Sequence, residues 1–201
     1  KEWDLCPAAK FVCRKFALDN VKEERFTTAQ TDALLRAAQD DFEPLTYLFV
    51  LIGLNTGMRH MEILRLRFEH IDFDAKRFFL PSAKAGARYQ PFPEQIVASL
   101  KNHQARLLDQ NGWVFPAETK SGHKDYMKSQ FKRVIVAAGM DPKRYTPHTM
   151  RHTAITRLAE AGHSAEFIQK ISGHKSISMV QRYTHISDKI IDEAMDAVVL
   201  C

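Results

Sequence analysis

A run of apolar residues from Leu45 to Leu54, placed directly after Pro44, most constrains how this chain can fold. Proline suits the first turn of a helix, and a helix that is apolar on every side is buried. The run is too short to span a bilayer, which takes about 20 apolar residues. Gly57 follows it and can close the helix in a left-handed conformation. The sequence therefore predicts a buried helix in the core of one domain.

The segments around this helix predict further helices and a small antiparallel sheet. Thr27 or Thr28 can cap a first helix, and another helix is expected to start near Arg59. Caps and apolar spacing predict later helices over residues 94–109, 124–138, 147–161, 164–173 and from Ser176 through Tyr183. Two short strands, Lys76–Pro81 and Arg88–Phe92, would form a hairpin. The expected fold class is α+β, mostly α-helical with a small antiparallel β-sheet.

Composition narrows the class of protein. A chain of 201 residues, 45% of them hydrophobic, is long enough for one domain with a core. Its three cysteines suggest neither a disulfide framework nor a zinc pattern, which favours a reducing, cytoplasmic setting. Neither a membrane-spanning run nor a signal-peptide pattern is found, so no membrane partner is expected. The net charge of +5 favours a polyanionic partner, although only weakly.

Two residue pairs predict an anion site. His148 and Arg151 are three positions apart near the start of a predicted helix, so they share a face at its positive end. Arg59 and Glu62 have the same spacing after a glycine turn. There the arginine can match two phosphate oxygens while the carboxylate fixes its orientation. Taken alone, an Arg-x-x-Glu pair is usually a solvated ion pair, and the His-x-x-Arg pair is also more often without a function.

A metal site is the alternative for the same helix. His148 and His152 stand four positions apart, as in a zinc protease, but Thr149 occupies the place of the catalytic glutamate. We therefore expect no metal and no cofactor. A phosphate held instead by arginine and histidine could be attacked by a phenol, and Tyr183 follows His174 by nine positions (183 − 174).

Five motifs in one order resemble the tyrosine recombinase (phage integrase) family. They are Thr56-Gly57-Met58-Arg59 with Glu62, Lys84 in the predicted hairpin, Pro147-His148-Thr149-Met150-Arg151-His152-Thr153, Ser172-Gly173-His174-Lys175-Ser176, and Tyr183-Thr184-His185. The resemblance runs from about Thr27 to Ser187. It implies a DNA integrase or site-specific recombinase that cuts and rejoins strands, without metal, through a 3′-phosphotyrosine intermediate.

The resemblance also implies a role for each residue. Tyr183 would be the nucleophile, and Glu62 would support the pocket. Lys84 would protonate the departing 5′ oxygen. The phosphate would be bound by Arg59, His148, Arg151 and His174.

Double-stranded DNA is the implied partner, contacted mainly at its phosphates. Basic residues that could line a groove for it are Arg88, Lys120, Lys124, Lys128, Lys132 and Arg133. For each of them a solvated surface charge is the alternative.

The implied organisation has three parts. Residues 1–25 are expected to be a linker or the tail of a missing N-terminal DNA-binding domain, since the chain starts at Lys1 rather than Met. Residues 26–187 would form the catalytic domain. Residues 188–201 would form a C-terminal helix or tail, docked on its own domain or exchanged between protomers of a dimer or tetramer on DNA.

Three other functions stay open. A type IB topoisomerase shares the chemistry and would relax supercoils without recombination. A non-catalytic DNA-binding regulator would be indifferent to Tyr183→Phe. A zinc hydrolase would lose its activity with a chelator.

Overall fold

The computed structural model describes residues 24–82, 86–181 and 183. The helices and the 3₁₀ turn of this part are α1 (Thr28–Gln39), α2 (Pro44–Thr56), α3 (His60–Leu64), the turn Phe68–His70, α4 (Gln95–Gln104), α5 (Lys128–Ala137), α6 (Pro147–Glu160), α7 (Ala165–Ser172) and α8 (Ser178–Gln181). The strands are β1 (Ile71–Asp72), β2 (Arg77–Leu80) and β3 (Arg88–Pro91). The predicted fold class, mostly helical with a small antiparallel sheet, is confirmed.

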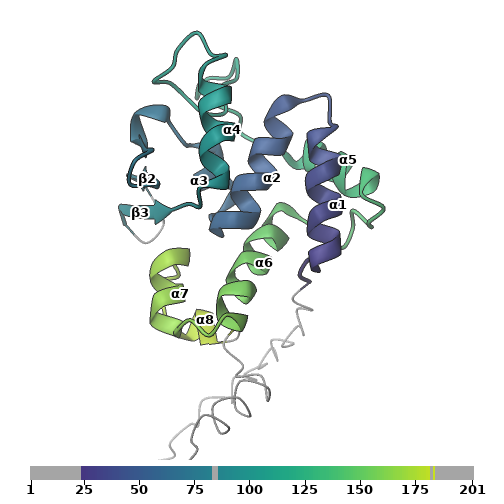
Figure 1. Ribbon diagram of the computed structural model, residues 1–201, viewed down its shortest axis with the longest axis vertical. Helices are drawn as coiled ribbons and strands as arrows, with labels where there is room; N and C mark the ends of the chain where they lie inside the picture. Colours follow the sequence, from purple (N-terminus) through teal and green to yellow (C-terminus); the bar gives the residue numbers. More distant parts are fainter. Residues whose placement is uncertain (1–23, 83–85, 182, 184–201) are drawn as a thin grey trace, which may run out of the picture.

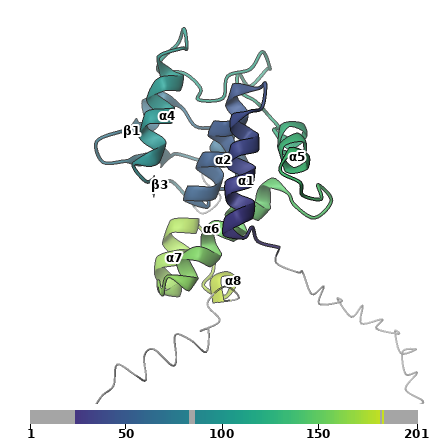
Figure 2. The same ribbon diagram turned by 45° about the vertical axis from the view of Figure 1, so that its right-hand side comes forward.

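Helix α2 is the centre of the molecule. Its residues Leu48, Phe49, Val50, Leu51 and Ile52 are all buried, as expected for a helix that is apolar on every side. It contacts α1, α3, α4, α5 and α6, and Figure 1 shows it between α1 on one flank and α4 with the strands on the other. In Figure 2, α5 lies beside α1, away from the strands. The predicted central helix is confirmed.

Helix α2 ends at Gly57, as the sequence predicts. Gly57 adopts a left-handed conformation with φ 63°, which glycine reaches without the steric cost that a side chain brings. The chain then turns through the buried Met58 into the short helix α3, whose N-cap is Arg59. This turn aims Arg59 across the C-terminal end of α2.

The sheet is larger than the predicted hairpin. In the described part of the chain, three strands pair antiparallel in the order β1-β2-β3. Strands β2 and β3 form the hairpin, with Leu80 opposite Arg88 and Arg77 opposite Pro91. Strand β1 has two residues, too few for a period of two to be visible in the sequence. Residues 83–85 of the hairpin turn, and with them Lys84, lie outside the described residues.

Two predicted helices are wrong at one end. Helix α4 stops at Gln104 rather than 109, and Leu108, expected on its apolar face, is fully exposed. The carboxylate of Asp109 accepts the backbone N–H of Asn111, which makes a turn in place of helix. Helix α5 starts at Lys128 rather than 124, and the backbone N–H of Lys124 donates to the carbonyl oxygen of Phe115.

The last described helices pack together at one end of the molecule (Figure 1). Helix α6 begins at Pro147 and α7 is capped by the Ser164 hydroxyl, both as predicted. Tyr183 was expected inside a short helix but follows α8, where its N–H donates to Val180. Its ring belongs to a second apolar cluster with Ile155, Ile168 and Val180.

The terminal segments keep their status as predictions. Residues 1–23 and 184–201, which include the predicted linker and the predicted helix 188–199, lie outside the described residues. Among the described helices, none combines the length and apolar character that crossing a membrane requires.

Candidate active site

Arg59 and Glu62 form the first part of the site. Oε2 of Glu62 accepts the backbone N–H of Arg59 at 3.0 Å, and its Oε1 accepts Nη1 of the same arginine at 3.0 Å. One carboxylate therefore fixes both the main chain and the guanidinium of Arg59, at a helix N-terminus where negative charge is favoured.

The same carboxylate binds a second arginine. Nη1 and Nη2 of Arg88 donate to Oε1 and Oε2 of Glu62, each at 3.0 Å, which is the bidentate geometry of arginine with a carboxylate. Burial raises the pKa of Glu62, but the hydrogen bonds and charges of Arg88 and Arg59 outweigh it, so the net pKa lies below its ordinary value. Glu62 is therefore an anion between two cations.

Gly173, which comes late in the sequence, lies next to both Arg59 and Arg88. Its carbonyl oxygen accepts Nη2 of Arg59 at 2.9 Å. It closes α7 with φ 64°, and a Cβ at this position would lie 2.9 Å from Cζ of Arg88. Glycine is thus required here for its conformation and for the room that Arg88 occupies.

Arg151 lies deepest in the site, with 2% of its surface exposed. Nη1 donates to the carbonyl oxygen of Gly57 at 2.8 Å, and Nη2 lies 3.1 Å from Nε2 of His174. Burial, followed by the nearby charge of Arg59, lowers the pKa of Arg151 to about 10. The guanidinium is therefore still charged at neutral pH.

A chain of hydrogen bonds sets the tautomer of His174. The hydroxyl of Ser172 lies 2.6 Å from the carbonyl oxygen of Ile168 and 2.7 Å from Nδ1 of His174. Since the hydroxyl has one proton and gives it to the carbonyl, it accepts from Nδ1–H. Nε2 then carries no proton and accepts the N–H of Arg151, which fits the 3.1 Å contact.

Tyr183 lies next to this network. Its ring is 7% exposed, and its centroid is 6.2 Å from the ring centroid of His174. Its hydroxyl lies 2.6 Å from Nδ1 of His152, one helical turn after His148 on α6. The rings of His148 and His152 meet edge to face at 4.6 Å. The structure thus gathers five predicted site residues and Glu62 into one cluster, called the pocket below, while Lys84 falls outside the described residues.

The predicted groove residues divide into two groups. Arg88 lies on Glu62, Lys124 bonds Glu43 at 3.1 Å, and Arg133 binds Asp41 through two nitrogens. These three are held by carboxylates of the protein. The other three are exposed, namely Lys120, Lys128 and Lys132.

Lys128 is near the pocket. Burial lowers the pKa of His60, and the positive charge of Lys128 lowers it further. The amine of Lys128 is therefore close enough to His60, the first residue of α3, to act on it electrostatically.

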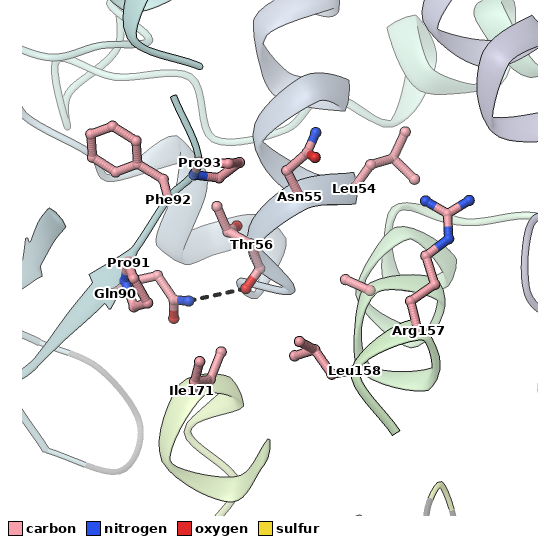
Figure 3. Close-up of a pocket in the computed structure, with 11 residues that line it drawn as sticks. Leu54, Asn55, Thr56, Gln90, Pro91, Phe92, Pro93, Arg157, Leu158 and Ile171 are labelled. Atoms are coloured by element: carbon pink, nitrogen blue, oxygen red, sulfur yellow. Dashed lines mark hydrogen bonds between the residues drawn. The ribbon is translucent and has the colours of Figure 1, made fainter. Parts of the chain in front are cut away.

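A cavity of about 370 Å³ opens beside the site between the end of α2, β3, α6 and α7 (Figure 3). Across one side of it, Nε2 of the buried Gln90 donates to the carbonyl oxygen of Thr56 at 3.1 Å. The same side chain accepts Nη2 of Arg88 at 3.3 Å. Gln90 thus ties β3, which carries Arg88, to the end of α2, and none of the predicted site residues lines the cavity.

Across residues 24–82, 86–181 and 183, no three His, Cys, Asp or Glu residues gather as metal ligands would. Arginine, histidine and tyrosine make up the pocket instead.

The comparison with protein families agrees with the motifs. The model of the phage integrase family matches residues 24–189. The chain belongs to the phage integrase family. The motif order that suggested this membership thus coincides with the matched region.

Individual members of the phage integrase family are similar over most of the chain. It is 28% identical to tyrosine recombinase XerA of Pyrococcus furiosus over 151 residues, 74% of this chain and 53% of that protein. It is 30% identical to the shufflon-specific DNA recombinase of Escherichia coli over 201 residues, 98% of this chain and 49% of that protein. The chain spans about half the length of these curated relatives.

The fold is also that of phage integrase family members. The Tn1549 transposon integrase, solved in complex with circular intermediate DNA, superimposes with a TM-score of 0.74 at 24% identity. The match covers 90% of this chain and 69% of that one. The arrangement around α2 is therefore the tyrosine recombinase catalytic-domain fold.

In this phage integrase family member, the positions of two residues of the pocket differ from what the sequence indicated. Arg88 was expected on a DNA-facing groove but lies inside the pocket, on Glu62. His152 was weighed only as a metal ligand, yet it contacts the hydroxyl of Tyr183. Arg88 pairs with the buried Leu80 across the hairpin and so shares its face of the sheet, a register that the sequence alone does not give.

Proposed function

We propose that this chain is the catalytic part of a site-specific DNA recombinase or integrase that joins Tyr183 to the 3′ phosphate of a cut strand. The observation that carries the proposal is the contact of Arg151 with His174, whose ring lies against that of Tyr183. A cation, an imidazole and a phenol converge there at the buried junction of α6, α7 and α8.

The two arginines supply the main catalytic effect in this proposal. A phosphodiester is already an anion, and attack by a phenol adds negative charge at the transition state. Fixed donors on the non-bridging oxygens stabilise that charge, and each is typically worth about a hundred- to a thousandfold in rate. Arg59 and Arg151 each use two N–H groups on carboxylate, carbonyl or imidazole partners, so donors of the five on each guanidinium remain for a phosphate.

The remaining steps follow from the chemistry of the leaving group. The departing 5′ oxygen is a strong base, so a proton donor belongs beside it, and Lys84 of the hairpin is the proposed donor. The phosphotyrosine bond keeps the energy of the broken linkage, so a 5′ hydroxyl can reverse the reaction without ATP. Exchange of partners between strands suits such an intermediate better than hydrolysis.

Double-stranded DNA would lie across the open side of the pocket. Among the predicted groove residues, exposed Lys128 beside His60 is the best placed for a phosphate, with Lys132 one turn along α5 on the same face. We also propose that two or four copies assemble on DNA, with residues 188–199 packing on a neighbouring copy. Deleting residues 187–201 should then abolish assembly and strand exchange.

The decisive experiment captures the covalent intermediate. A nicked suicide duplex, incubated in excess EDTA, should give a protein–DNA adduct with the wild-type protein and none with Tyr183→Phe. Tyr145→Phe is the matched control, since Tyr145 is also buried but its hydroxyl bonds Gln30 at 2.9 Å rather than a residue of the pocket. An adduct that persists in Tyr183→Phe would overturn the proposal.

The same preparation separates the competing functions. Recombination between two target sites indicates a recombinase, whereas relaxation of supercoils without recombination indicates a type IB topoisomerase. Loss of the adduct in EDTA would point to a metal enzyme instead.

A further inference from the structure

His152 makes the closest contact to the hydroxyl of Tyr183. Nδ1 of its half-buried imidazole lies 2.6 Å from that oxygen, and the two rings are tilted by 38° with centroids 5.6 Å apart. The tyrosine ring packs on Ile155, Ile168 and Val180, so the hydroxyl is held in this position by the apolar cluster. None of the six catalytic roles implied by the family falls on His152.

The neighbouring histidine is engaged in a different way. His174 faces Ser172 with Nδ1 and Arg151 with Nε2, so its ring nitrogens belong to the phosphate-binding side of the pocket. His152 instead has Nδ1 on the reacting oxygen itself. The distance is within the range for proton transfer between a phenol and a general base.

We propose that His152 is the general base that accepts the proton of Tyr183 during strand cleavage, an inference that rests on the proposed function. The phenolic O–H bond breaks and its proton moves to Nδ1, while the phenolic oxygen forms a bond to phosphorus. The bond from phosphorus to the 5′ oxygen breaks, and that oxygen leaves with its electron pair and takes a proton from a general acid. In the reverse reaction, His152 returns its proton to the departing phenolate.

The surrounding charges suit this role. The titratable and charged groups near the pair include His148 and Arg151 on α6, and His174 beside the tyrosine ring. The neutral imidazole is the form of His152 that can accept a proton. A bound phosphate adds the negative charge that stabilises the imidazolium formed during attack.

The test is His152→Asn, because the amide oxygen can still accept a hydrogen bond at the place of Nδ1 but cannot accept the proton. Single-turnover adduct formation on a nicked duplex should be about a hundred- to ten-thousandfold slower, with unchanged DNA affinity. The wild-type rate should rise with pH as an imidazole loses its proton, and this rise should vanish in the variant. His163→Asn is the matched control, since His163 is exposed and stacks on Phe167.

A substrate with sulfur in place of the bridging 5′ oxygen separates base from acid. A thiolate leaves without a proton, so this substrate should leave the His152→Asn defect in place. Rescue by the sulfur substrate would show that His152 serves the leaving group, which overturns the inference. So would a wild-type rate, or a slow rate that keeps the wild-type pH profile, since His152 would then only position Tyr183.

Folding is checked separately. The melting temperature of His152→Asn is compared with that of His152→Gln, and the kinetic comparison uses whichever variant melts like wild type. Failure of the wild-type protein itself to form an adduct would reject the proposed function, an outcome distinct from a fully active His152 variant.

Discussion

Glu62 and Arg88 face each other in a bidentate ion pair, with both carboxylate oxygens 3.0 Å from guanidinium nitrogens. The pair is almost fully buried, with 9% and 12% of the two side chains exposed. Arg59 shares the same carboxylate. Whether Arg59 points correctly into the pocket therefore depends on a residue in a strand that begins 29 positions away (88 − 59).

Arg88→Met should slow strand cleavage without changing how DNA binding depends on salt. Each phosphate contact contributes about −0.9 to the slope of log affinity against log salt, but the guanidinium of Arg88 is already on Glu62. Lys132→Ala, at an exposed position of α5, is the comparison and should make the slope less steep. Titrations over a range of salt, together with single-turnover cleavage, check both statements. A flatter slope for Arg88→Met would mean that Arg88 contacts phosphate.

Glu62→Gln should be less stable than wild type at neutral pH by about 3 kcal/mol, since the exchange breaks a buried pair. The folded-state pKa of Glu62 is lowered, so its contribution is present above its ordinary pKa of about 4.3 and is lost as pH falls through the folded value. The difference between the two proteins should therefore shrink on acidification. Denaturant unfolding at a series of pH values measures it, and a difference that stays constant down to strong acid would contradict the ion pair.

Gly173→Ala should disturb the pocket, whereas Gly162→Ala should not. Both glycines have positive φ, 64° and 80°, so both substitutions bear a conformational cost of about 1–2 kcal/mol. A Cβ at 173 would also lie 2.9 Å from Arg88, while at 162 it would meet nothing within 4 Å. Thermal melts should show that both variants are destabilised. Cleavage assays should show that only Gly173→Ala is impaired. Equal cleavage by both variants would show that Arg88 can move aside.

Much of the pocket could be predicted, because several of its residues lie next to helix starts and helix ends that are visible in the sequence. Arg59 follows a helix-ending glycine, and His148 with Arg151 shares a helix face next to Pro147. These positions depend on backbone geometry within a few residues, which spacing in the sequence records. The family motifs then named the remaining members, His174 and Tyr183.

Other features could not be predicted, because they depend on contacts across the fold. Arg88 is a charged residue of the kind usually found on protein surfaces. Its orientation toward Glu62 depends on the pairing of β3 with β2. His152 reaches Tyr183 only because the tyrosine lies beyond α8 rather than within it. Leu108 looked like a core residue but was left outside once α4 ended at Gln104.

Each of the two arginines of the pocket donates a hydrogen bond to the carbonyl oxygen of a glycine that ends a helix. Arg59 donates to Gly173, at the end of α7, and Arg151 donates to Gly57, at the end of α2. Main-chain atoms of two helix-ending turns thus help to set the distance between the two cations, together with Glu62. A residue inserted into or deleted from either glycine turn would move one of these carbonyl oxygens and so change the spacing of the two guanidinium groups.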